Sequence, residues 1–278
     1  MNREPDPLPD RLNETLFQQR PVPAVRTSYT GAWLVTAWVL CAAVGLWILL
    51  RPWVTRLLWP PPPQPPRTAR LFAALAYEGI SEKTNEVSPA RFEEHLTALR
   101  AAGYVPIRLR DVEAFYRDGT PLPEKAVLLT MDQSRKTSYF MASAPLRRLG
   151  WNAVMFLWTG PIEAEDPAAL LWPYVRNMAR SEIWEVGAQS HMGFQPIPAS
   201  PRGRKGRFLT SPRWIAEDHR YEEPDEFLQR LRADHERCWQ LIRERGGVTP
   251  IAFAYPDGDF GQHQRRLPMT SLLNTRLA

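Results

Sequence analysis

Side chains that can take part in chemistry follow three apolar segments of the chain. Carboxylates and imidazoles act as general acids or bases and ligate divalent cations, whereas amides only donate and accept hydrogen bonds. The three segments are residues 126–131, 184–190 and 250–256, and the polar residues at or just after their C-terminal ends are Asp132, Gln133, Gln189, Ser190, His191 and Asp257. These residue types allow acid–base or metal chemistry if the fold brings the segments together.

Several of these side chains also have a simpler interpretation. His191 is the only histidine near the other candidates, and one imidazole does not hold a catalytic metal, for which about three protein ligands are expected. Asp257 and Asp259 lie in a Tyr-Pro-Asp-Gly-Asp turn, where aspartate and glycine are favoured for conformational reasons. Ser190 has no plausible partnered base. We therefore favour a loop histidine, turn aspartates and an unreactive serine, and keep a relocated metal ligand at His191 as the alternative.

Strand-like and helix-like segments alternate from residue 71 onward. Apolar runs of strand length predict strands at 71–77, 126–131, 152–158, 184–190 and 250–256. Helices are predicted between them, from the N-cap Ser88 and Pro89 to Gly103, and at 138–149, 170–181 and 225–245. Strands separated by such helices predict an α/β fold with a parallel sheet, open or barrel-like, whose sites lie at the C-terminal ends of the strands.

Several motifs resemble those of the NodB-homology polysaccharide deacetylases, and more narrowly those of the periplasmic poly-N-acetylglucosamine N-deacetylases. Residues 122–133 are similar to the family's first motif, an apolar strand followed by Thr-Phe-Asp-Asp-Gly. The sequence EVGAQS at 185–190 resembles the second, Glu-Ile-(Gly/Ala)-Ser-His-Thr. Later landmarks follow in the family's order at residues 199–203, 220–223, 232–234 and 254–258. The resemblance covers roughly residues 70–260 and implies an incomplete barrel of the (β/α) deacetylase type.

The resemblance implies metal-dependent hydrolysis of an acetamide. In the family a divalent cation polarises the acetamide carbonyl and lowers the pKa of its bound water, an Asp acts as general base, and a later His protonates the leaving amine. Asp132 occupies the position of the general base. The ligand positions, one Asp and two His in the family, are occupied here by Gln133, Gln189 and Phe194. Amides and a phenyl ring lack the donors that a cation needs, so we predict a vestigial Asp132 and no metal.

Four parts are predicted along the chain. Residues 1–30, spotted with prolines and balanced in charge, indicate a flexible N-terminal tail. Residues 31–58 contain the uncharged run AWLVTAWVLCAAVGLWILL, just long enough for a transmembrane anchor with membrane lipid as its partner. Residues 59–68 are a proline-rich spacer, and residues 69–278 are the deacetylase-like domain. We expect this domain to be C-terminally short, because the family continues through further strands that carry the acid histidine.

Charge and cysteine content narrow the class of partner. The chain has 35 Lys+Arg against 30 Asp+Glu, without the concentrated basic residues of a nucleic-acid-binding protein, so no nucleic acid is expected. Cys41 lies in an apolar run and Cys238 in a polar region, so no disulfide framework is available.

Because the charges beside residues 31–58 do not decide topology, the resemblance alone implies the location: a single-pass protein of the bacterial inner membrane with a periplasmic C-terminal domain.

Two hypotheses of function follow from the replaced ligands. The first is a membrane-anchored, catalytically inactive protein that binds glycan, or serves a polysaccharide synthase or another membrane complex as an accessory subunit in exopolysaccharide synthesis or export. The second is an active N-deacetylase that holds zinc or another divalent metal in a rearranged site of Asp132, His191 and Glu78 or Asp257. A purely structural role in a membrane complex is also compatible with the Trp-rich span. The expected contacts with substrate or partner are His191, Tyr255, Asp257 and Trp214.

Overall fold

The structure is a computed structural model that describes residues 30–58, 68–262 and 270. Two compact units, Met1–Pro65 and Pro66–Ala278, divide the chain, and each is described here by itself. The predicted tail at 1–30 and the predicted spacer at 59–68 lie almost wholly outside the described residues. Both therefore stay predictions.

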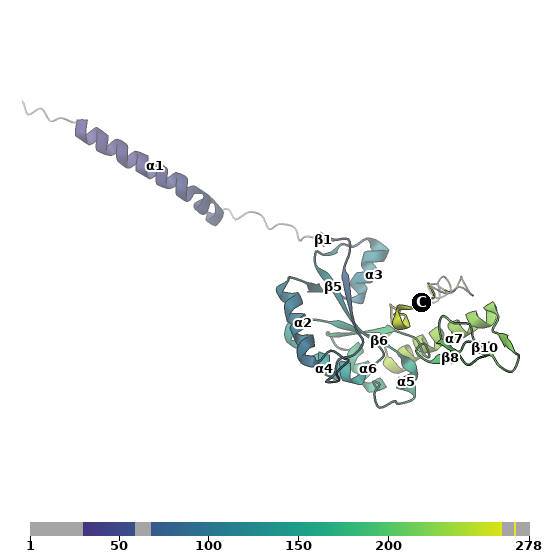
Figure 1. The fold of residues 1–278 in the computed structure, drawn as a ribbon. Helices are drawn as coiled ribbons and strands as arrows, with labels where there is room; N and C mark the ends of the chain where they lie inside the picture. The colour runs from purple at the N-terminus through teal and green to yellow at the C-terminus, as the bar shows by residue number, and fades with distance from the viewer. Residues whose placement is uncertain (1–29, 59–67, 263–269, 271–278) are drawn as a thin grey trace, which may run out of the picture. The chain divides into compact units, whose positions relative to one another are not determined.

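The first unit contains the helix α1 (Thr30–Leu58), drawn in purple in Figure 1. Its bounds agree with the predicted segment 31–58, so the helix itself is confirmed. Its role as a transmembrane anchor is not shown, since nowhere in the described part of the chain does a helix combine the length and the apolar content needed to cross a bilayer. The thiol of Cys41 is exposed on this helix.

A parallel sheet organises the second unit (Figure 1). Its strands lie in the order β2 (Ala73–Tyr77), β5 (Ala126–Met131), β6 (Ala153–Leu157) and β7 (Trp184–Ala188). The short strand β3 (Val105–Pro106) pairs in parallel with the first residues of β5. Because every pair is parallel, the residues that follow these strands meet at one edge of the sheet. The predicted α/β fold with a parallel sheet is confirmed.

Apolar side chains cover both faces of this sheet. Every residue of β5 and β6 is buried, as expected for the uninterrupted apolar sequences of these two strands. Leu129 and Met155 belong to a core on one face, and Leu128 and Phe156 belong to a second core on the other. The longer helices that contribute to the first core are α2 (Pro89–Ala101), α4 (Lys136–Leu149), α6 (Trp172–Ala179) and α7 (Pro224–Leu241), and Ile162 of the short helix at residues 159–163 joins them.

Local signals in the sequence set the ends of the helices. The hydroxyl oxygen of Ser88 accepts a hydrogen bond from the backbone N–H of Arg91 at 3.2 Å, and Pro89 is the first helical residue of α2, as predicted. α4 ends at Gly150, whose φ of 66° lies in the left-handed region that glycine adopts without strain. On α7, Cys238 is fully buried, and burial raises the pKa of its thiol to about 12.

Short elements complete the second unit, and the sequence did not predict them. Apart from α3, which has ten residues, they are too short to carry a hydrophobic period, which is the signal that finds longer elements. They are the helices α3 (Leu109–Asp118) and α5 (Thr159–Glu163), a π turn (Ile242–Gly246), a 3₁₀ turn (Pro256–Gly258), and the antiparallel pairs β1 (Thr68–Ala69) with β4 (Leu122–Pro123), β8 (Pro196–Pro198) with β9 (Lys205–Arg207), and β10 (Trp214–Ile215) with β11 (Arg220–Tyr221).

The predicted strand at 250–256 is wrong. One isolated bridge, between Ala188 and Phe253, joins this segment to the end of β7. Its two hydrogen bonds, from the N–H of Ala188 to the carbonyl of Ala252 and from the N–H of Ala254 to the carbonyl of Ala188, are both 2.9 Å long. Prolines at both ends of the segment lack the N–H that a longer ladder requires. The bridge nevertheless holds the segment beside the end of β7.

Candidate functional site

The ends of β5 and β7 bring together the two amide residues of the expected site. The backbone N–H of Gln133, just after β5, donates to Oε1 of Gln189, just after β7, at 2.7 Å. Gln189 is fully buried. Asp132 is tied to the end of β2, because its backbone N–H donates to the carbonyl of Tyr77 at 3.3 Å. The prediction that Asp132, Gln133 and Gln189 meet at the C-terminal edge of the sheet is confirmed.

The backbone adopts unusual conformations where these loops leave the strands. Gln133 and Ser134 have φ values of 64° and 53°, and Ser190 has a φ of 104°. Residues other than glycine pay about 1–3 kcal/mol each for such conformations, and they concentrate at functional sites. The surrounding structure must therefore hold the loops after β5 and β7 in these positions.

The carboxyl group of Asp132 lies in an environment that disfavours its charge. Burial raises its pKa above the usual value, the Gln189 side chain opposes this effect, and the negative charges of Glu78 and Asp257 add to it. Glu78 follows β2 and Asp257 follows the segment bridged to β7. Carboxylates from two other parts of the chain thus act on Asp132 at this edge of the sheet.

Four buried donors near the same edge have no hydrogen-bond partner within the described residues. They are Nε2 of Gln189, the indole N–H of Trp158 just after β6, the hydroxyl of Tyr255 and Nε of Arg135, which lies beside Gln133. The Gln189 amide influences Asp132, yet its Nε2 reaches no acceptor with ordinary hydrogen-bond geometry. Burial raises the pKa of Tyr255 to about 12, so this hydroxyl keeps its proton. An unpaired buried donor costs about 1–3 kcal/mol, which favours sites that receive acceptor atoms from a ligand or from water.

An arginine contacts the first of the replaced ligand positions. Arg135 is the N-cap residue of α4, and its guanidinium donates to Oε1 of Gln133 at 2.9 Å and to Oε1 of Glu86 at 2.8 Å. The Gln133 amide oxygen is therefore engaged by an internal cation. An amide suits this contact because its oxygen accepts without adding another negative charge beside Asp132.

A buried carboxylate on α7 holds the loop that follows β7. Asp234 is 4% exposed and accepts hydrogen bonds from Oγ of Ser190 and the backbone N–H of Met192, both at 2.6 Å, and from the backbone N–H of His191 at 3.2 Å. Ser190 in turn accepts from the backbone N–H of Gly193 at 2.6 Å. The prediction that Ser190 lacks a partnered base is wrong, but its hydroxyl is buried and committed to Asp234, which indicates a structural role.

Phe194, at the third replaced position, belongs to an aromatic contact. Its ring centroid lies 4.9 Å from that of Trp158. Phe194 also lines a small cavity of about 100 Å³ together with Asp257 and Asp259. Arg207 forms ion pairs of 3.3 Å with both aspartates. This pairing agrees with their interpretation as turn residues.

His191 and Trp214, two expected contact residues, are held by other groups. Nδ1 of His191 lies 3.1 Å from Oγ1 of Thr159, and burial lowers the pKa of its imidazole. Trp214 packs its ring 5.1 Å from Tyr221 and lines a separate cavity of about 590 Å³, which Asp132 does not line. Within the described residues no hydrogen bond joins His191 to Asp132. Among the residues that the structure describes, Asp132, His191 and Glu78 or Asp257 do not form a group that could hold a metal ion, as the alternative hypothesis requires.

The residues present do not fit a catalytic divalent metal. Gln133 uses its amide oxygen for Arg135, Gln189 uses its own for a backbone N–H, and Phe194 has no donor atom. Across the ranges 30–58 and 68–262, no group of three or more His, Cys, Asp or Glu side chains is arranged to hold a metal ion. We therefore derive no reaction step through a metal.

Replacing Asp132 by Asn is expected to stabilise the fold at neutral pH. The pKa of this carboxyl is higher in the folded than in the unfolded chain, where it is about 3.9. Its ionisation therefore lowers the stability of the fold as the pH rises above that value, and a neutral amide removes this cost. We expect the free energy of unfolding, measured in urea, to rise by about 1 kcal/mol at pH 7 and to stay unchanged at pH 3. Asp118→Asn, at an exposed position on α3, is the matched control. An Asp132→Asn protein less stable than the wild type at pH 7 would contradict this prediction.

Comparison with protein families and with curated proteins identifies relatives of the chain. The family model of the polysaccharide deacetylases matches residues 119–268, slightly more than half of the chain. Poly-beta-1,6-N-acetyl-D-glucosamine N-deacetylase from Escherichia coli K12 is 25% identical over 206 residues. This match covers 68% of the present chain and 31% of the relative, so the chain spans about a third of the length of that protein.

Solved structures show the same fold at low sequence identity. A de-N-acetylase from Aggregatibacter actinomycetemcomitans superposes with a TM-score of 0.64 at 20% identity, covering 73% of this chain and 84% of that one. The BpsB deacetylase domain from Bordetella bronchiseptica also gives 0.64, at 21% identity, covering 77% and 88%. The resemblance that the motifs indicated is confirmed, and this chain belongs to the polysaccharide deacetylase family.

Proposed function

We propose that this protein binds polysaccharide through a deacetylase-type domain that does not hydrolyse N-acetyl groups. The observation that carries the proposal is the donor set at the edge of the sheet, where Gln133, Gln189 and Phe194 occupy the three ligand positions. A general base at Asp132 needs an activated water, and these three side chains cannot supply the metal that would activate it. Inactivity follows from the loss of all three ligands together.

The groups that remain are suited to hydrogen bonds with sugars. Asp132 offers acceptor oxygens, while Nε2 of Gln189 and the hydroxyl of Tyr255 are donors without a partner in the described residues. Sugar hydroxyls both donate and accept, so they can satisfy such a mixed set. The rings of Phe194 and Trp158 offer apolar surface close to the same loops. The names of the curated relatives suggest β-1,6-linked N-acetylglucosamine oligomers as the first ligand to test.

Acetate release and ligand binding, measured on the same purified full chain, test the proposal. In the presence of zinc we expect no acetate from β-1,6-linked N-acetylglucosamine oligomers above the level of an Asp132→Ala variant. Isothermal titration calorimetry with the same oligomers is expected to detect binding. Acetate release that disappears in Asp132→Ala would contradict the proposal and support the active deacetylase. Absence of both binding and hydrolysis would contradict it as well and favour a purely structural role.

Matched variants show whether the bound sugar occupies this site. Gln189→Leu removes an unpaired donor together with the oxygen that accepts from the N–H of Gln133, and we expect it to weaken the Kd at least tenfold. Tyr255→Phe removes a single hydroxyl, disturbs the packing less, and is also expected to weaken binding of the sugar. Gln229→Leu makes the same change at an exposed position on α7, away from this site, and is expected to leave the Kd unchanged. Equal affinities in all variants would place the sugar elsewhere.

Membrane anchoring, the inner-membrane location and an accessory role beside a polysaccharide synthase stay predictions. Their support is the uncharged run at residues 32–50 and the similarity to enzymes named for polysaccharide deacetylation. Washing membranes with alkaline carbonate tests the anchor, since an integral protein stays in the pellet. Release into the supernatant would contradict it.

A further inference from the structure

The outer edge of β2 is an open strand edge among the described residues. β2 ends the order of the sheet and pairs only with β5. The carbonyl of Tyr77 accepts from the N–H of Asp132, so it faces the sheet. Because backbone groups alternate along a strand, those of Ala74 and Ala76 face outward. An open row of N–H and C=O groups is a template for a further strand.

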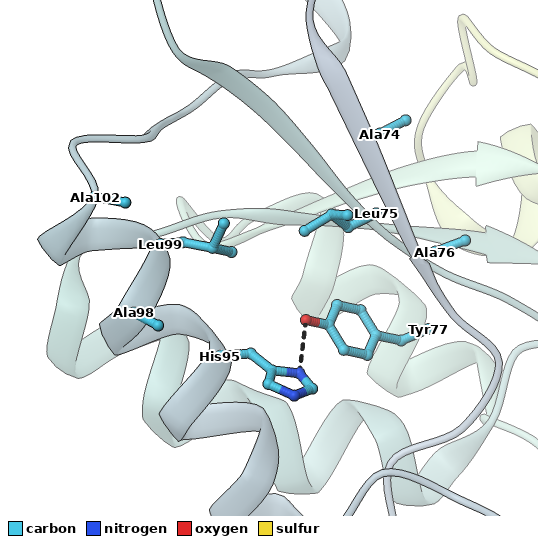
Figure 2. A pocket seen from close by; sticks show the side chains of 8 residues that line it. All are labelled: Ala74, Leu75, Ala76, Tyr77, His95, Ala98, Leu99 and Ala102. Carbon is cyan, nitrogen blue, oxygen red and sulfur yellow. Dashed lines mark hydrogen bonds between the residues drawn. The ribbon is translucent and has the colours of Figure 1, made fainter.

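An apolar groove of about 610 Å³ runs along this open edge, between β2 and α2 (Figure 2). Leu75 and Leu99 line its sides, and the hydroxyl of Tyr77 lies 3.4 Å from Nδ1 of His95 at one end. Just before β2, the side chain of Leu71 is 73% exposed, which is unusual for a leucine beside an apolar groove. The open backbone edge and the uncovered apolar surface therefore occur together.

Opposite charges flank this strand. Arg70 precedes it and Glu78 follows it, and both are exposed. Neither forms an ion pair with any residue that the structure describes. Position 74 lies midway between them, so two antiparallel copies paired at Ala74, with the pairing continued from β2 to the bends at residues 70 and 78, place Arg70 of each copy opposite Glu78 of the other. Opposite charges at such cross-strand positions stabilise pairing.

We propose that two copies of this chain associate by antiparallel pairing of their β2 strands, centred on Ala74. The outward backbone groups of Ala74 and Ala76 then form hydrogen bonds between the copies, and two symmetric pairs of Arg70 with Glu78 close the ends. In this register residue 71 lies opposite residue 77, so the exposed Leu71 of each copy covers the Tyr77 end of the other's groove. A single strand pair buries little surface, so the association is weak and reversible.

This pairing also reaches the edge of the candidate site. Glu78 is one of the carboxylates whose charge acts on Asp132. Arg70 of the second copy places a positive charge beside Glu78. The proposal is independent of the proposed polysaccharide binding, because it rests on the strand edge alone.

Charge reversal tests the register by sedimentation velocity of the full chain over a range of concentrations. The wild type is expected to form a reversible dimer. Arg70→Glu and Glu78→Arg should each weaken dimerisation roughly tenfold or more, since each change opposes like charges at both ends. The double variant should return to within about threefold of the wild type, because it restores both pairs. Arg91→Glu, an exposed change on α2, is the control and should have no effect.

Three outcomes of the sedimentation experiment would overturn the proposal. The first is a wild type that stays monomeric at every concentration. This result would indicate that the groove is covered by the chain's own C-terminal residues or by another protein. A dimer that both single variants leave unchanged would indicate association through α1. Failure of the double variant to restore dimerisation would exclude the register.

A cysteine at the centre of the strand gives a second, independent test. Residues that form a hydrogen-bonded antiparallel pair have Cα atoms about 5.5 Å apart, which suits a disulfide. In a Cys41→Ser background, Ala74→Cys is therefore expected to form a covalent dimer on mild oxidation. Ala164→Cys, exposed at the end of α5, is the matched control and should stay monomeric. Equal yields of covalent dimer from both variants would overturn the proposal.

Discussion

A variant that combines Gln133→Asp, Gln189→His and Phe194→His is expected to bind about one zinc ion per chain, whereas the wild type binds none at stoichiometric level. The three changes restore the donor set of one Asp and two His that the family uses. Two of the three positions already lie together, since the backbone N–H of Gln133 and the side-chain oxygen of Gln189 are 2.7 Å apart. Elemental analysis after dialysis, followed by titration with a chelator, measures the metal directly and does not depend on activity.

The matched control is the two-ligand variant, which keeps Phe194 and should hold zinc below stoichiometry. An aspartate at position 133 can pair with Arg135, which now donates to Gln133. Adding Arg135→Gln to the triple variant removes this competitor. If neither variant bound zinc, the loops would not have the geometry of a metal site, and the inferred ligand positions would be wrong. Stoichiometric zinc in the wild type would overturn the proposed function itself.

Asp234→Asn is expected to lower the free energy of unfolding by about 2–4 kcal/mol, because an amide keeps at most two of the three hydrogen bonds and turns its NH₂ group toward a buried donor. An amide keeps the size of the side chain but accepts through only one oxygen. Ser190 and the N–H groups of His191 and Met192 are then left partly unpaired in a buried position. Urea denaturation monitored by tryptophan fluorescence measures the change.

Amide hydrogen exchange in the loop after β7 gives a second measurement of the effect of Asp234→Asn. Glu236→Gln, an exposed change two residues further along α7, is the control and should change stability by less than about 0.5 kcal/mol. We also expect faster amide hydrogen exchange at residues 190–193 in Asp234→Asn than in Glu236→Gln. A variant as stable as the wild type, with unchanged exchange in this loop, would show that Asp234 does not hold the loop.

The parts of the fold that the sequence predicts are those with a strong local signal. β5 and β6 are uninterrupted apolar runs, and α2 begins at the Ser88–Pro89 pair that caps it. The meeting of Gln133 with Gln189 was also predictable, because parallel strands end at one edge of a sheet. The apolar runs locate the strands and the caps locate the helices. Because parallel strands end at one edge of the sheet, these signals together place the centre of the candidate site.

The remaining features depend on contacts between distant residues. Asp234 lies more than 40 positions from the loop that it holds, and although residues 232–234 belong to the family resemblance, their sequence does not show which groups Asp234 binds. The engagement of Gln133 by Arg135 depends on the conformation of one turn. The segment 250–256 has the composition of a strand, yet it makes a single bridge because its bounding prolines limit the ladder.

The two cysteines differ in a way that makes the natural chain convenient for labelling. Cys41 is exposed, whereas the thiol of Cys238 is buried and its raised pKa of about 12 leaves almost no thiolate near neutral pH. A maleimide reagent should therefore modify the folded protein at one position, on α1. A membrane-impermeant probe attached there reports on the surroundings of this helix in intact cells without any engineered residue.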